Sequence, residues 1–187
     1  MKKYLLLFSV VILSSCQDGN VVEEAVLIGT ETNAAETLEQ NPNIKAKNII
    51  LFIGDGMGPN QVALARFAVG GANHRLSFEN FPVTGIVLNH SAENLYTDSA
   101  AAATAWAAGV KTKNGHLSVD SDNKFLPTIP ELLSTKGYLT GLVATSSITH
   151  ATPAAFYAHI KSRSKHKQIA QMLVESDIAI ALGGGSE

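Results

Sequence analysis

The 187-residue sequence contains a single cysteine, Cys16, so the chain cannot form a disulfide framework. Charged residues make up only 16% of the chain, and the formal net charge is −2 at pH 7, which gives no reason to expect nucleic acid as a partner. No internal repeat is present. Hydrophobic residues make up 45%, too many for a disordered chain, so one globular domain with a sizeable core is expected.

The N-terminus has the layout of an export signal. Two lysines precede an apolar run from Tyr4 to Leu13, which is too short to span a bilayer, and small residues lead to Cys16. The ending "LSSC" resembles the lipobox of bacterial lipoproteins, which implies lipidation of Cys16; a buried strand or helix is the alternative. We therefore expect a signal peptide over residues 1–16 and a polar tether over 17–46. The chain would be exported to the bacterial periplasm or cell surface and lipid-anchored to a membrane.

From residue 47 onward, strand and helix patterns alternate. Short apolar runs followed by glycine or polar residues predict buried strands, and capping signals with Pro or Gly punctuation predict helices. The predicted strands are 49–53, 83–89, 138–145 and 177–185, and the predicted helices begin at Pro59, Ser99, Thr128, Thr152 and Lys167. This order predicts an α/β fold with helices on both faces of a mostly parallel sheet, and ligands beyond the carboxyl ends of its strands.

Two residues at these strand and helix ends could carry chemistry. Asp55, in "GDGMG", could hold a hard cation or zinc, or it could simply occupy a tight turn. Ser99 precedes a run of alanines at a helix start, where free N–H groups and the helix dipole favour an anion. It is either an ordinary N-cap or a nucleophile.

Three further residues have both a functional and an ordinary interpretation. The planar fork of Arg163 could grip two oxygens of a phosphate, or it could complement the C-terminus of a helix. Thr152, before a proline, looks like a helix cap. His150 could be a metal ligand, a neighbour of a ligand or a surface residue.

Taken together, the segments resemble the N-terminal part of the alkaline phosphatase family. The resemblance covers roughly residues 47–187 and rests on the order and spacing of "NIILFIGDGMG", "FPVTGIV", "YTDSAAAATAWAAGVKTKNG", "ITHATPAAFYAHIKSR" and "DIAIALGGG". It implies a three-layer α/β/α fold and the hydrolysis of phosphate monoesters by double displacement. Ser99 matches the nucleophile that becomes phosphoserine, Arg163 the phosphate-gripping arginine, and Asp98 the residue that orients this arginine.

The resemblance also implies Zn²⁺ and Mg²⁺ as cofactors. Asp55 matches the aspartate that bridges a zinc and the magnesium site, and the oxygen of Ser99 approaches the second zinc. Thr152 matches a magnesium ligand, and His150 lies where family members have aspartate or histidine beside the magnesium water shell.

The family's remaining metal ligands lie C-terminal to the position that matches Glu187. We therefore expect the fold to be incomplete at its C-terminus, and the 187-residue chain alone to turn over an aryl phosphate negligibly. The alternatives are an inactive lipoprotein that binds an anion at Ser99, or a phosphodiesterase of the same superfamily. Family members often dimerise, so a homodimer is possible for the complete protein.

Overall fold

The computed structural model describes residues 47–185, and the predicted signal peptide, Cys16 and tether lie outside them. Contacts divide the chain into two units, with the boundary between Gly85 and Ile86. Among the helices of residues 47–185, none has the length and apolar character needed to cross a membrane.

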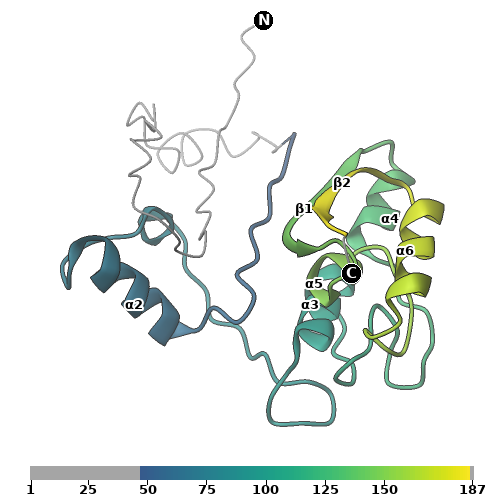
Figure 1. Cartoon of the computed structure of the whole chain (residues 1–187), viewed down its shortest axis with the longest axis horizontal. Coiled ribbons are helices and arrows are strands. Elements are labelled where there is room, and N and C mark those ends of the chain that lie inside the picture. Colours follow the sequence, from purple (N-terminus) through teal and green to yellow (C-terminus); the bar gives the residue numbers. More distant parts are fainter. Residues whose placement is uncertain (1–46, 186–187) are drawn as a thin grey trace, which may run out of the picture. The chain divides into compact units, whose positions relative to one another are not determined.

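The described part of the first unit contains one α-helix and one short 3₁₀-helix. Helix α2 (Pro59–Gly70) begins at a proline, whose missing N–H costs nothing in the first turn, and η1 spans Ser77–Asn80. Arg66 of α2 forms an ion pair with Glu79 of η1, and its Nε lies 3.3 Å from Oε2 of that carboxylate. This pair ties α2, which is labelled in Figure 1, to η1.

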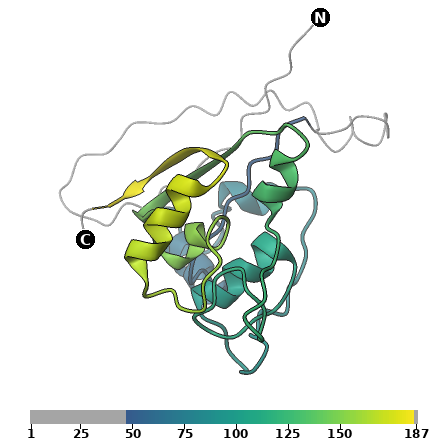
Figure 2. The ribbon, with the colours of Figure 1, turned by 90° about the vertical axis from the view of Figure 1, so that its right-hand side faces the viewer.

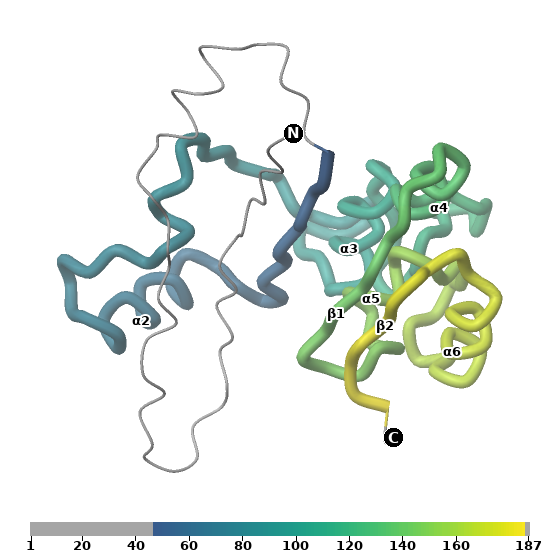
Figure 3. Tube along the Cα trace, turned by 90° about the horizontal axis from the view of Figure 1, so that it is seen from above, coloured from purple at the N-terminus to yellow at the C-terminus, as the bar shows by residue number. Residues whose placement is uncertain are grey.

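Two strands and four α-helices lie in the described part of the second unit. Strands β1 (Thr140–Ser147) and β2 (Ile178–Gly184) pair in parallel and run side by side (Figure 3). The helices are α3 (Ser99–Ala108), α4 (Ile129–Ser134), α5 (Ala151–Ala154) and α6 (His166–Glu175). Helix α6 lies beside the two strands (Figure 2). The predicted α/β class with parallel strands is confirmed, as are the strands near 140 and 178.

Small side chains allow close packing around α3. Ala100, Ala103 and Ala107 on α3 are buried, as are Ala151 and Ala154 on α5, and these two helices contact each other. Larger residues complete the core, and Leu117 and Ile169 are both fully buried. The alanine run is therefore a packing surface that brings the start of α3 close to the segment after β1.

Two predicted strands are wrong. Residues 49–53 and 83–89 form no strand, and their apolar side chains are largely exposed: Ile49 and Val83 are each 83% exposed and Ile86 is 96% exposed. An apolar run identifies a segment suited to a sheet, but a strand also needs a neighbouring strand to accept its backbone hydrogen bonds. Neither segment has a strand partner among residues 47–185.

Tyr157 makes the stability of the second unit depend on pH in the alkaline range. Its side chain is 4% exposed, its hydroxyl donates to the Ile148 carbonyl oxygen at 2.7 Å, and burial raises its pKa to about 12. An unfolded tyrosine ionises near pH 10, so the folded chain retains a proton that the unfolded chain releases. This contribution to stability is therefore complete below about pH 10 and falls by about 2–3 kcal/mol as the pH rises towards 12.

We expect Tyr157→Phe to flatten the loss of stability between pH 10 and 12. The variant also loses one hydrogen bond, which costs about 1 kcal/mol at neutral pH. Urea titrations at pH 8, 10 and 11 measure both effects. Tyr138→Phe, at a side chain that is 53% exposed, is the matched control and should keep the wild-type slope. An unchanged slope in Tyr157→Phe would contradict this role.

Candidate active site

Asp98 caps helix α3 and places Ser99 in its first turn. The Asp98 carboxylate oxygen Oδ1 accepts a hydrogen bond from the Ala101 N–H at 2.9 Å, so Asp98 is the N-cap and Ser99 the first helical residue. The interpretation of Ser99 as the N-cap is therefore wrong by one position, because its neighbour has the better placed oxygen. Ser99 is half-buried at the positive end of a ten-residue helix.

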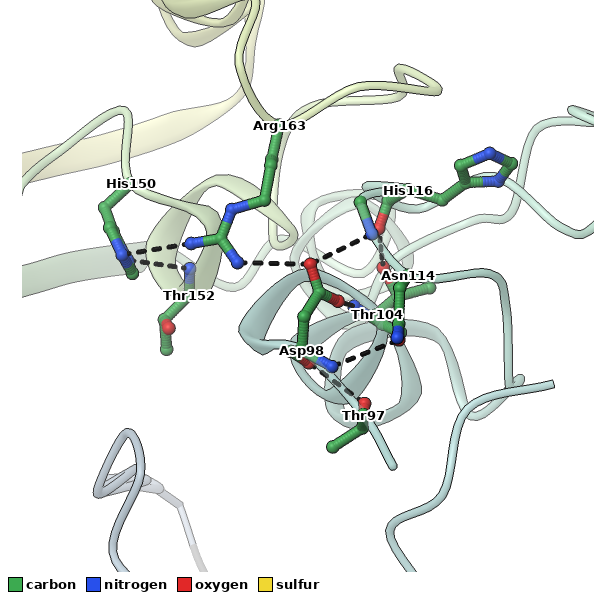
Figure 4. A network of polar contacts seen from close by, with 10 residues as sticks. Thr97, Asp98, Thr104, Asn114, His116, His150, Thr152 and Arg163 are labelled. Carbon is green, nitrogen blue, oxygen red and sulfur yellow. Dashed lines mark hydrogen bonds and ion pairs between the residues drawn. The ribbon is translucent and has the colours of Figure 1, made fainter. Parts of the chain in front are cut away.

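The second oxygen of Asp98 links α3 to two other segments. Oδ2 accepts from the Gly115 N–H at 2.9 Å and from Arg163 Nη1 at 3.1 Å (Figure 4). The side chains of Asp98 and Arg163 are 26% and 30% exposed, so water partly screens this ion pair. The main effect of the ion pair is on geometry, because it fixes the direction of the Arg163 guanidinium beside Asp98, next to Ser99.

Arg163 is also held through its backbone. Its N–H donates to the Gly115 carbonyl oxygen at 2.8 Å, and three residues earlier Ile160 exchanges two backbone hydrogen bonds of 2.9 Å with Leu117. Its guanidinium has five N–H donors, and Nη2 lies 3.2 Å from His150 Nε2. The contacts to Asp98 and His150 use two of these donors, so Arg163 can keep both while it binds an anion.

His150 and Thr152 lie at the start of α5. His150 is the N-cap and Thr152 the second helical residue, so the prediction that Thr152 caps the helix is wrong. His150 Nδ1 faces the Thr152 N–H at 3.5 Å, while Nε2 faces Arg163 at 3.2 Å. A neutral imidazole has only one acceptor nitrogen, so His150 accepts either from the Thr152 N–H or from Arg163, and the contact with Arg163 is the shorter of the two. The structure thus brings His150, Thr152, Arg163 and Asp98 into one network (Figure 4).

Asp55 belongs to the first unit and lies in a tight turn. The Met57 N–H donates to the Gly54 carbonyl oxygen at 3.2 Å, and Gly56 has a φ of 69°, which favours glycine. The turn interpretation of Asp55 is therefore confirmed. Its role as a metal ligand stays a prediction.

Asn114 and Gly115 belong to the site, although the sequence did not single them out. Asn114 Oδ1 accepts from the Asp98 N–H at 3.1 Å, and Gly115 contacts both Asp98 and Arg163. The signal that could have identified them is the Asn-Gly pair, which marks a tight turn. That signal predicts a turn without saying which residues the turn will contact.

Comparison with known proteins identifies the family. The family model described as alkaline phosphatase matches residues 46–187. The chain belongs to the alkaline phosphatase family.

Individual alkaline phosphatases and related enzymes agree with this assignment. The chain is 43% identical to the alkaline phosphatase of Escherichia coli (strain K12) over 145 residues, 73% of this chain and 30% of that protein. It is 39% identical to the streptomycin-6-phosphate phosphatase of Streptomyces griseus over 153 residues, 78% of this chain and 34% of that protein. The chain thus spans about a third of the length of these relatives.

Solved alkaline phosphatases confirm the fold. The structure of the enzyme from the Antarctic bacterium TAB5 matches with a TM-score of 0.66 and 38% identity, over 70% of this chain and 37% of that one. A mutant of the TAB5 enzyme was solved with Mg bound. The alkaline-phosphatase-like fold expected from the sequence is therefore confirmed for the part that the chain covers.

The metals that the family implies require a donor set that the described residues supply only in part. A hydroxyl such as that of Thr152 suits magnesium, which prefers oxygen ligands. A catalytic zinc normally has three protein ligands, and residues 47–185 contain no group of three or more His, Cys, Asp or Glu side chains that could hold a metal. Residues 47–185 therefore do not by themselves supply the ligands of a zinc centre.

Proposed function

We propose that the protein carrying this chain hydrolyses phosphate monoesters through a phosphoserine at Ser99. The observation that carries the proposal is the ion pair between Asp98 and Arg163 beside the N-terminus of α3. A guanidinium fork and a helix N-terminus are both suited to binding the oxygens of a phosphate group that carries two negative charges. Family membership supports the same chemistry.

The reaction consists of two displacements at phosphorus. In the first, the Ser99 oxygen bonds to phosphorus, the bond to the ester oxygen breaks, and the alcohol leaves with a proton. In the second, a water oxygen bonds to phosphorus, the bond to the Ser99 oxygen breaks, and Ser99 regains a proton as inorganic phosphate leaves. Arg163 binds the non-bridging oxygens throughout, and the dipole of α3 favours negative charge at Ser99.

We further propose Zn²⁺ and Mg²⁺ as cofactors, with Asp55, Ser99 and Thr152 among their ligands and His150 beside the magnesium site. Bound metal ions stabilise an alkoxide and the charge on a transferring phosphoryl group. Export and a lipid anchor at Cys16 remain part of the proposal, as does a homodimer of the complete protein.

Trapping of the phosphoserine tests the proposed function. The protein is expressed from the complete reading frame that encodes these residues, supplied with zinc and magnesium, and mixed with a labelled phosphate monoester at acidic pH. We expect the label on Ser99. We expect Ser99→Ala to carry no label and to turn over the substrate at least about a thousand-fold more slowly than wild type. Ser121→Ala, in the turn at residues 121–122, is the control and should behave as wild type.

Three results would contradict the proposal. Unimpaired turnover in Ser99→Ala would exclude Ser99 as the nucleophile. Phosphate binding without label or turnover would instead support the anion-binding alternative. Faster turnover of diesters than of monoesters would indicate a phosphodiesterase.

A further inference from the structure

The turn at residues 113–116 lies between the Ser99 helix and Arg163. The His116 N–H donates to the Lys113 carbonyl oxygen at 3.2 Å and closes the turn. Gly115 has a φ of 85°, a conformation that glycine adopts without the steric cost of a Cβ. The side chain of Asn114 forms no part of this backbone closure, and it contacts Asp98 instead.

Three hydrogen bonds connect this turn to both sides of the anion site. Asn114 Oδ1 accepts from the Asp98 N–H at 3.1 Å, and the Gly115 N–H donates to Asp98 Oδ2 at 2.9 Å. The Gly115 carbonyl oxygen accepts from the Arg163 N–H at 2.8 Å. Asp98 and Arg163, which Figure 4 shows in contact, are 65 positions apart in the chain. Gly115 is bonded to both of them, and Asn114 is bonded to Asp98.

The contact of Asn114 differs in kind from those of Gly115. Gly115 uses its backbone, so any residue that tolerated the conformation could make the same bonds. Asn114 uses its side-chain oxygen to hold the peptide N–H of Asp98, the residue that precedes Ser99. Loss of that oxygen frees the entry to α3 to shift relative to Arg163, and displacements of about 1 Å at a reacting centre can cost about a hundred-fold in rate.

We propose that Asn114 is a positioning residue of the phosphoryl site, which sets the distance between Ser99 and the guanidinium of Arg163 through Asp98. This inference rests on the proposed function, because it assigns Asn114 a part in binding the phosphate group that Ser99 and Arg163 share. Asn114 touches neither the phosphate nor the reacting atoms. Its effect passes through the backbone of Asp98 and is measured as affinity for phosphate.

The test compares Asn114→Ala with Asn123→Ala. Asn123 also lies in a tight turn of the second unit, with a φ of 64° and its N–H bonded to the Asp120 carbonyl oxygen, so its replacement destabilises a turn remote in sequence from Asp98. Inorganic phosphate is titrated against each protein from the complete reading frame, and urea titration gives the free energy of unfolding. We expect Asn114→Ala to weaken phosphate affinity by about ten-fold, and Asn123→Ala to leave it within about two-fold.

A second readout follows Arg163 directly and needs no activity. In the 187-residue chain, the Nε–H resonance of Arg163 in a ¹⁵N spectrum should shift or broaden in Asn114→Ala and stay in place in Asn123→Ala. If Asn114→Ala fails to fold, Asn114→Ser preserves a residue favoured in turns while shortening the side chain that reaches Asp98, and the same shift is expected.

The outcomes separate the two proposals. Equal losses of stability in the two alanine variants, with phosphate affinity and the Arg163 resonance unchanged in Asn114→Ala, would reduce Asn114 to a structural turn residue and overturn the inference. Failure of wild type to form phosphoserine would overturn the proposed function alone. The difference in phosphate affinity between the variants would still decide the role of Asn114.

Discussion

Asp98→Ala is expected to lower the free energy of unfolding by about 2–4 kcal/mol. Three contributions are lost together. Removal of an N-cap costs about 0.5–2 kcal/mol, and a donor such as the Gly115 N–H left without its partner costs about 1–3 kcal/mol. The partly exposed pair with Arg163 adds about 0–1 kcal/mol. The total loss of stability is large for one partly exposed carboxylate because both of its oxygens accept hydrogen bonds, one from the helix and the other from outside it.

Asp98→Ser separates these contributions. A serine can still cap α3, but its hydroxyl is too short to reach Gly115 and Arg163 as well. Urea titration should therefore show a loss smaller by about 1 kcal/mol than in Asp98→Ala. Equal stability of Asp98→Ala and wild type would mean that the three hydrogen bonds to this carboxylate do not persist in solution.

Leu117→Ala is expected to cost about 3 kcal/mol in the free energy of unfolding, within the range for leucines that leave a cavity. The Leu117 side chain is fully buried, and its backbone pairs with Ile160 through two hydrogen bonds of 2.9 Å. The substitution leaves those backbone bonds available and removes only the packed side chain. The measurement is a urea titration monitored by circular dichroism.

Leu95→Ala is the matched control, because the same change is made at a side chain that is fully exposed in the same unit. It should alter stability by less than about 0.5 kcal/mol. Similar losses at both positions would show that the core around Leu117 is not packed as described.

Local signals predicted much of the second unit. Thr128 and Glu131 form the expected capping box of α4, with the Thr128 N–H bonded to Glu131 Oε2 at 2.7 Å. The alanine run up to Gly109 predicts α3, whose C-cap is that glycine with a φ of 72°. These elements were predictable because the residues that start and stop them lie within about three helical turns of each other in the sequence.

The errors arise where the outcome depends on a neighbour. Ser99 and Thr152 were each considered as caps, yet Asp98, one residue earlier, and His150, two residues earlier, take that position. The side chains of these earlier residues can also accept a hydrogen bond from the helix start, and only packing decides which one does so. The two apolar segments that form no strand failed for a similar reason, because composition does not reveal whether a partner strand is present.

The site itself lay beyond local reasoning. Ser99, His150, Thr152 and Arg163 each had a more ordinary interpretation. That these residues meet depends on how the segments around positions 98, 114, 150 and 163 fold. The resemblance to alkaline phosphatases identified Asp98 and Arg163 as partners, and the ion pair between them is present. Asn114 escaped because its signal describes only its own turn.

The exposed edges of the strand pair β1–β2 affect how readily copies of the chain associate. Among the described residues each strand pairs only with the other, and apolar side chains along them are open to solvent: Val143 is 78% exposed, and Ile180 and Leu182 are each 58% exposed. Free backbone groups beside apolar side chains are a template for strands of other molecules. At high protein concentration we therefore expect these edges to promote association between copies of the chain.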